Sequence, residues 1–198
     1  AYQGQKWNKD KLVMDMTWEQ SDQGIPAGVD KCIGGAWVHK PVPYSVSTTQ
    51  NAIPNGIIFR MGELYLNYAE ALNECHEAPP AEAYAAIDTI RLRSGMPVLP
   101  RNLSKEEFRE RVRNERAVEL AFEGHRLWDL RRWEEADTEG VMKGDMYGIK
   151  IFKIDGVSNE YRYEPYVFEV RSFKPAMYRH PFPQGEMDKL YLIQNPGW

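Results

Sequence analysis

The chain has 198 residues and a formal net charge of −4. This charge gives no basic field for phosphate backbones, so it argues against nucleic acid as the main partner. No segment approaches the roughly 20 apolar residues that a helix needs to span a bilayer. The length suits one ordinary domain with a buried core, and we expect a single domain over residues 1–198.

Residues 1–55 show little helical periodicity. They contain several helix breakers, among them the pair Gly34 and Gly35 and the prolines Pro41, Pro43 and Pro54. We therefore expect an irregular region of loops, with room for a hairpin.

Apolar side chains recur at helical steps from residue 57 onward, which predicts a helix over about 57–76. Its apolar positions are Ile58, Met61, Tyr65, Tyr68 and Leu72. The pair Pro79 and Pro80 ends this helix and starts another over about 80–94, with Ala83, Ile87 and Ile90 on one face. The two helices predict an antiparallel hairpin similar to a tetratricopeptide (TPR) hairpin.

Two more helices are expected after residue 103. Ser104 and Glu107 have the spacing of a capping box, which predicts a helix from there to about Glu123. Gly124 permits a break before a helix over about 126–136. The fold class is therefore mostly α, with a helical core at 57–136, and the turn-rich residues 137–198 hold short strands at 150–154 and 166–170.

Residues 113–133 carry nine formal charges, with His125 counted as neutral, among helix-forming apolar residues. Glu115 and Glu119 fall on the same helical face as Phe108, Val112 and Phe122, so both carboxylates should face inward. Buried carboxylates need cationic partners. We expect a structural ion network of these two acids with arginines; the candidates are Arg91, Arg126 and Arg131, and also Arg93 and Arg116.

Glu115 and Glu119 also permit an enzymatic interpretation. Side chains at i and i+4 lie about 5 to 6 Å apart at Cβ, which is close to the separation of the two acids in retaining glycosidases. Catalytic acids flank a substrate from opposite walls, however, whereas these two share one packed face. We therefore expect no catalytic residue, and a glycoside hydrolase using this pair remains an alternative.

Neither a metal site nor a cofactor is expected. His76 and Glu77 lack the second histidine of a zinc-protease helix, and Pro79 would end that helix. Cys75, near a helix end, is expected to be a small packing residue, and whether it pairs with Cys32 is left open.

Five blocks of the chain resemble, in order, the C-terminal signature of the SusD/RagB family of surface nutrient-binding lipoproteins. The blocks are FRMGELYLNYAEALNE at 59–74, IRLRSGMP at 90–97, RNERAVELAFEGHRLWDLRRW at 113–133, YRHPFP at 178–183 and QNPGW at 194–198. The resemblance implies a helical scaffold and a protein that is not an enzyme.

The resemblance also implies a role and a location. Such proteins capture nutrients, usually glycans, at the outer surface of the outer membrane and deliver them to a SusC-like TonB-dependent transporter. Family members are usually more than twice this length and begin with a signal peptide and a lipidated cysteine. We therefore expect this chain to be the C-terminal portion of a longer exported protein, with membrane association only through a lipid anchor absent from this chain. A peptide-binding member of the family and a helical adaptor that binds a protein partner remain alternatives.

Aromatic residues offer a candidate ligand site, because sugar rings stack on Trp and Tyr side chains. The segment rich in Gly, Pro, Ser and Thr near the start of the chain holds Trp7, Trp18 and Tyr44. We nominate these three as a stacking set for a glycan. Trp128, Trp133 and Trp198 are instead expected to pack in the interior.

Overall fold

The computed structural model describes residues 5–6, 14–15, 40, 57–154 and 160–198. They fall into two compact units. Asn55–Asp129 form the first, called the helical unit here, and the second contains Leu130–Trp198 together with strands β1 (Gln5–Lys6) and β2 (Met14–Asp15). The expectation of one domain over residues 1–198 stays a prediction. Within the described ranges, no helix has the length and apolar character needed to cross a membrane.

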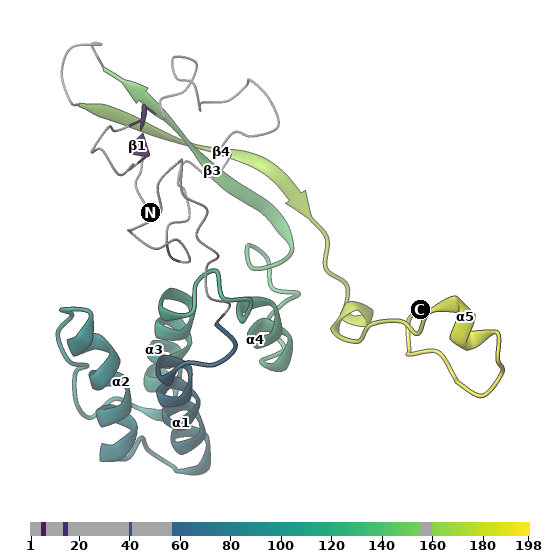
Figure 1. The fold of residues 1–198 in the computed structure, drawn as a ribbon, viewed down its shortest axis with the longest axis horizontal. Helices are drawn as coiled ribbons and strands as arrows, with labels where there is room; N and C mark the ends of the chain where they lie inside the picture. Colours follow the sequence, from purple (N-terminus) through teal and green to yellow (C-terminus); the bar gives the residue numbers. More distant parts are fainter. Residues whose placement is uncertain (1–4, 7–13, 16–39, 41–56, 155–159) are drawn as a thin grey trace. The chain divides into compact units, whose positions relative to one another are not determined.

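Helices α1 (Met61–Cys75) and α2 (Ala81–Arg93) form the predicted hairpin, and α1 also packs against α3 (Lys105–Glu119) (Figure 1). The apolar series that predicted this helix does not mark a fully buried face, since Ile58, just before α1, is 82% exposed. Met61 is 60% exposed and Tyr68 51% exposed, whereas Leu66 and Ala69 are fully buried. Helix α1 carries two apolar stripes, and the one that contains the small Ala69 packs inward.

Helix α2 buries Ala83, Ile87 and Ile90 as predicted. It ends in a Schellman motif, in which the Met96 amide donates to the Arg91 carbonyl over 2.8 Å. Gly95 has a φ of +71°, the left-handed conformation that this motif requires and that glycine adopts without strain.

The capping box of α3 is confirmed. The Glu107 amide donates to Ser104 Oγ over 3.2 Å, and the Ser104 amide donates to the Glu107 carboxylate over 2.8 Å. The helix ends at Glu119, earlier than predicted, because the chain turns through Phe122 with a φ of +64°. Phe122 is 72% exposed and does not share the buried face of Phe108 and Val112. Helix α4 (Arg126–Arg132) follows.

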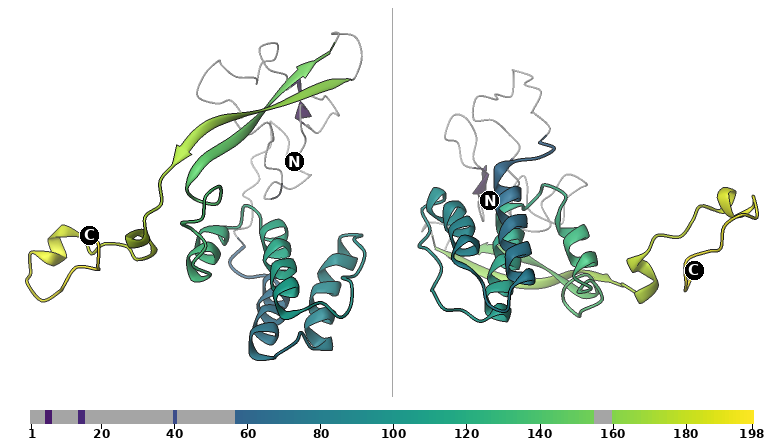
Figure 2. Two further views of the ribbon diagram at one scale, coloured as in Figure 1. Left: turned by 180° about the vertical axis from the view of Figure 1, so that it is seen from behind. Right: turned by 90° about the horizontal axis from the view of Figure 1, so that it is seen from below.

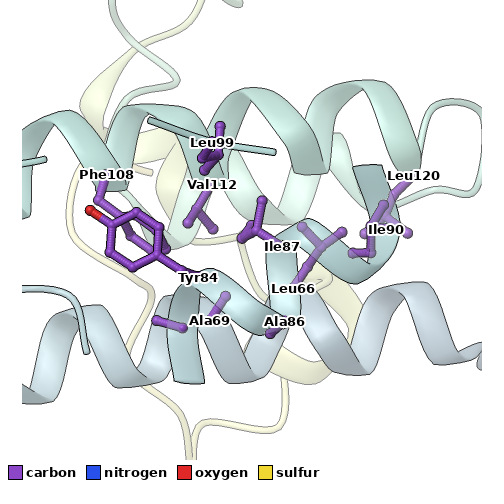
Figure 3. Close-up of a cluster of buried hydrophobic side chains, with 11 residues drawn as sticks. Leu66, Ala69, Tyr84, Ala86, Ile87, Ile90, Leu99, Phe108, Val112 and Leu120 are labelled. Atoms are coloured by element: carbon purple, nitrogen blue, oxygen red, sulfur yellow. The ribbon is translucent and has the colours of Figure 1, made fainter. Parts of the chain in front are cut away.

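One hydrophobic core holds the helical unit together. Leu66 and Ala69 of α1, Ile87 of α2, and Phe108 and Val112 of α3 meet at its centre (Figure 3). At one end the rings of Tyr84 and Phe108 pack edge to face, with centroids 4.8 Å apart. The Tyr84 hydroxyl accepts a hydrogen bond from the Leu103 amide over 2.9 Å, so this buried polar group is satisfied. The prediction of a mostly α fold is confirmed.

The second unit contains a long hairpin of β3 (Gly144–Lys153) and β4 (Tyr161–Arg171), visible from behind and from below in Figure 2. These antiparallel strands are longer than predicted. The apolar runs at 150–154 and 166–170 mark only part of each strand, and backbone pairing extends through polar neighbours as far as Gly144 and Arg171.

Residues 173–198, called the closing segment here, contain the short helices η1 (Pro175–Tyr178) and α5 (Gln184–Met187). Phe173 packs with Leu130 and Ala136 in a small second core, against which Trp133 and Met177 also pack. The predicted packing role of tryptophan is wrong for Trp128 and Trp198, whose exposed fractions are 59% and 52%.

Hydrogen bonds join the two blocks of the closing segment that lie at 178–183 and 194–198. Gln194 Oε1 accepts from the Phe182 amide over 2.8 Å, and Gln194 Nε2 donates to the Phe182 carbonyl over 3.1 Å. Asn195 Nδ2 donates to the His180 carbonyl over 2.6 Å. The two motifs therefore bind each other and close the loop that runs between them.

Candidate functional site

The nominated stacking set of Trp7, Trp18 and Tyr44 lies outside the described residues. Cys32 does too, whereas Cys75 is exposed with a free thiol and does not pack in the core. The acids Glu115 and Glu119 and the arginines bonded to them lie within the described residues. They decide what Glu115 and Glu119 are able to do.

Glu115 is paired with an arginine of the neighbouring helix. Arg91 of α2 donates from Nη1 to Glu115 Oε2 over 2.7 Å. The two side chains are only 16% and 12% exposed. Arg91 Nε also donates to the Pro97 carbonyl over 2.7 Å, which fixes the guanidinium in place. The cation that pairs with Glu115 is thus itself held in place by the backbone at Pro97, just after α2.

Glu119 is held by two arginines. Arg93 Nη2 donates to both Glu119 carboxylate oxygens over 2.7 Å, and Arg60, at the start of α1, donates to Oε1. Arg60 also donates from Nε to Glu123 over 2.6 Å. The pKa of Arg60 is raised, chiefly by its hydrogen bond to the Glu123 carboxylate. Gly62 leaves the room for this arrangement, since a Cβ there would meet the Arg60 guanidinium and lie 2.9 Å from Glu119 Oε1.

A third ion pair is the most buried of the set. Arg116 of α3 donates from Nε and Nη2 to the two carboxylate oxygens of Asp129 over 3.1 and 3.0 Å. Arg116 Nη1 also donates to Asn67 Oδ1 of α1 over 2.6 Å. Parallel bonds of this kind fix direction as well as charge. This pair joins α3 and the start of α4 to α1.

The other two nominated arginines, Arg126 and Arg131, lie in the short helix α4. Arg126 is exposed and forms no ion pair within the ranges that the structure describes. Arg131 belongs to the second unit, where its guanidinium contacts His180 Nε2 over 2.5 Å. Helix α4 begins after the turn through Phe122, so Arg126 does not continue the face of α3.

Sequence reasoning missed Arg60, Glu123 and Asp129 as members of the network. A signal was present, because Arg60 and Gly62 stand in one of the five blocks, and Glu119 and Glu123 stand in another. These blocks meet between α1 and α3. The same two blocks bring His125 Nε2 to 3.8 Å from Glu63 Oε2. The motifs that carry the resemblance are therefore largely an interface between helices.

The arrangement stabilises the scaffold, and the carboxylates of Glu115 and Glu119 are both engaged in ion pairs with arginines. A pocket of about 430 Å³ opens beside the start of α2, lined by Pro79, Ala81, Tyr84, Ala85, Arg101 and Asn102. Neither glutamate lines it. Its arginine is occupied as well: Arg101 Nη2 donates to Asp88 over 2.5 Å, and its guanidinium lies 4.9 Å from the centroid of the Tyr84 ring.

The sequence profile described as the SusD family matches residues 1–198. The chain belongs to this family. The resemblance to the SusD/RagB family is thereby confirmed, and it extends over the N-terminal residues as well as over the five blocks.

Similar proteins share the family. The chain is 38% identical over 86 residues to SusD-like protein P25 of Formosa agariphila, which is 42% of this chain and 16% of that protein. It is 33% identical over 99 residues to SusD-like protein P38 of the same organism, 46% of this chain and 19% of that protein. A crystal structure of a SusD-like protein from Bacteroides fragilis matches with a TM-score of 0.80 and 29% identity, covering 100% of this chain and 37% of that one. The matches thus cover well under half of each relative's length.

SusD-like proteins are in general non-catalytic proteins that bind nutrients such as glycans. As a family they work with SusC-like transporters and are associated with the outer membrane.

Proposed function

We propose that this chain is part of a protein that captures glycans reversibly, without cleaving them, at the surface of the outer membrane. The captured glycan is delivered to a SusC-like TonB-dependent transporter, and the full-length protein is held at the membrane by a lipid anchor. The observation that supports this proposal most strongly is family membership over residues 1–198.

The ion network supports binding over hydrolysis. A general acid needs a proton to give, and a nucleophile needs open access to the sugar carbon. Glu115 is bonded to Arg91, and Glu119 is bonded to Arg93 and Arg60. Both carboxylates are held by guanidinium donors, and their side chains are only 12% and 10% exposed, so neither offers a sugar carbon open access.

The ligand contacts proposed for this function are Trp7, Trp18 and Tyr44. Stacking on a sugar ring uses the flat face of an aromatic side chain, so the ring matters more than its polar tip. Replacing each of them by alanine should weaken glycan binding. Replacing Trp7 or Trp18 by phenylalanine is the matched control, because it keeps a flat ring and should retain most of the affinity.

A glycan array probed beside a peptide library tests the proposal. We expect the chain to bind one or a few glycans and no peptide, and the affinity measured by calorimetry to fall in the three alanine variants. The circular dichroism of the helices should stay unchanged. Binding of peptides alone would replace glycans by peptides as the ligand, and unchanged glycan affinity in all three alanine variants would dismiss the stacking set.

Delivery to a transporter is tested with the full-length protein in cells. We expect a surface-accessible lipoprotein that cross-links to a TonB-dependent barrel. A protein that stays inaccessible to surface labelling would contradict the proposed location.

A further inference from the structure

We propose that a pocket in the closing segment is a binding subsite for a uronic acid unit of a glycan. The pocket has a volume of about 510 Å³ and is lined by Pro175, Ala176, Tyr178, Arg179, Pro196 and Gly197. Small-molecule sites commonly have volumes of about 300 to 1,000 Å³. The inference rests on the proposed glycan binding and adds the chemical class of the sugar.

The walls of the pocket are held in place by hydrogen bonds. Trp198 Nε1 donates to the carbonyls of Ala176 and Arg179, both over 2.9 Å. The Tyr178 hydroxyl donates to Asp137 Oδ1 over 2.6 Å and accepts from the Asp137 amide over 3.2 Å. Both aromatic side chains beside the pocket therefore have their polar atoms bound within the chain.

Trp198 offers a rigid surface for a sugar ring. The residue adjoins the pocket lining through Gly197 and is 52% exposed, and because its indole N–H is engaged it presents no free side-chain donor to solvent. Gly197 makes the close approach of this residue possible. It has a φ of +89°, and a Cβ there would come within 2.7 Å of Ala176 Cβ.

Arg179 supplies a cation whose side chain has no partner among the described residues. Its backbone is engaged at both ends, because its amide donates to the Ala176 carbonyl and its carbonyl accepts from Trp198. Its side chain is exposed and makes no hydrogen bond or ion pair in the part of the chain that the structure describes. This contrasts with Arg101 in the pocket beside α2, which is bound to Asp88.

A fixed indole near a guanidinium that no described residue pairs matches a sugar ring that carries a carboxylate. The planar guanidinium binds a carboxylate through two parallel hydrogen bonds, while the apolar face of the ring stacks on the indole. A neutral sugar would stack on the indole but would bring no anionic group to pair with the Arg179 guanidinium. Charge complementarity thus favours a uronate over a neutral hexose.

Calorimetric titration of the whole chain tests this assignment. The probes are galacturonate, glucuronate and mannuronate oligosaccharides, each beside its carboxyl-reduced neutral counterpart. We expect at least one uronate series to bind about tenfold or more tightly than its neutral counterpart. That preference should disappear in Arg179→Gln and survive in part in Arg179→Lys.

Two controls separate the charge from the fold. Arg126→Gln removes another exposed arginine that has no ion pair among the described residues and does not line the pocket, and it should leave uronate affinity unchanged. Trp198→Phe keeps a ring but loses the two hydrogen bonds, and it should weaken uronates and neutral sugars alike. The Arg179 side chain bonds to nothing in the described chain, so Arg179→Gln should leave the melting temperature unchanged.

Equal affinity of Arg179→Gln and the parent chain for every uronate would overturn the inference, as would binding of neutral glycans only. In either case binding of any glycan leaves the proposed function standing. Binding of no glycan at all would overturn both.

Discussion

Arg116 and Asp129 form a bidentate ion pair whose side chains are only 4% and 6% exposed. The pair is completed by Asn67 of α1, and Glu70 Oε2 lies 3.9 Å from Arg116 Nε. Removing one partner of a buried pair leaves an uncompensated charge, which costs far more than the pair itself contributes. The ion pair therefore fixes the start of α4 against α3, and the bond to Asn67 links both to α1.

Asp129→Asn should lower the free energy of unfolding by about 3 kcal/mol, because Arg116 keeps its charge and loses its counter-charge. Urea unfolding followed by circular dichroism measures the loss. The double variant Arg116→Met with Asp129→Leu is the control, since it removes both charges and should recover most of the stability. An Asp129→Asn variant as stable as the parent would show that this pair does not hold the fold.

Glu119→Gln should be more destabilising than Glu115→Gln. Glu119 loses its charge partners Arg60 and Arg93, whereas Glu115 loses only Arg91. We expect losses of about 2 to 3 kcal/mol for Glu119→Gln and about 1 to 2 kcal/mol for Glu115→Gln, between the values for buried and exposed pairs. Chemical unfolding of both variants in one buffer gives the order, and the reverse order would contradict the network as drawn.

Ser104→Ala should cost about 1 kcal/mol, because the Glu107 amide loses its capping acceptor at the start of α3. Ser104→Asp is the matched control, since its carboxylate accepts the same hydrogen bond and should keep the stability. The midpoint of thermal unfolding reports the difference. If alanine and aspartate gave the same midpoint, the cap would have no role in stability.

The ion pair of Glu74 and Arg109 should give the fold an acid-sensitive contribution. Arg109 donates to both Glu74 carboxylate oxygens over 2.7 Å, and this hydrogen bonding lowers the pKa of Glu74. A pKa that is lower in the folded state stabilises the fold above the ordinary value of 4.5, and the contribution is lost as the pH falls through the folded value.

Glu74→Gln should therefore reduce the difference in unfolding free energy between pH 7 and pH 3, by less than about 1 kcal/mol since the pair is partly exposed. Urea titrations at the two pH values measure this difference. Glu82→Gln, at an exposed acid of α2 that forms no ion pair within the described residues, should leave it unchanged. If the Glu74→Gln variant kept the parent's full pH dependence of stability, the ion pair of Glu74 and Arg109 would not be its cause.

Local signals predicted the helices well. The Ser104 and Glu107 spacing identified the start of α3, and the single apolar stripe of Ala83, Ile87 and Ile90 identified the buried face of α2. Helix α1 was harder because it carries two apolar stripes. Periodicity alone does not say which of them faces the core.

Partners distant in sequence could not be assigned from spacing. Arg60 and Glu119 are 59 positions apart, so only the packing of α1 on α3 brings them together. Arg126 is close to Glu119 in sequence, yet the turn through Phe122 separates α3 from α4, and Arg126 forms no ion pair within the described residues. The nominated aromatic residues lie outside the described ranges, and their role stays a proposal.

The most direct test of the central claim measures stability, glycan affinity and sugar cleavage together in Glu115→Gln and Glu119→Gln. The best-bound glycan of the array serves as ligand and as substrate. If these glutamates belong to a scaffold, both variants lose stability, keep the parent's glycan affinity under conditions where they are folded, and release no reducing ends, as the parent does. Release of reducing ends by the parent chain, abolished in Glu115→Gln without loss of stability, would contradict the account and make the pair catalytic.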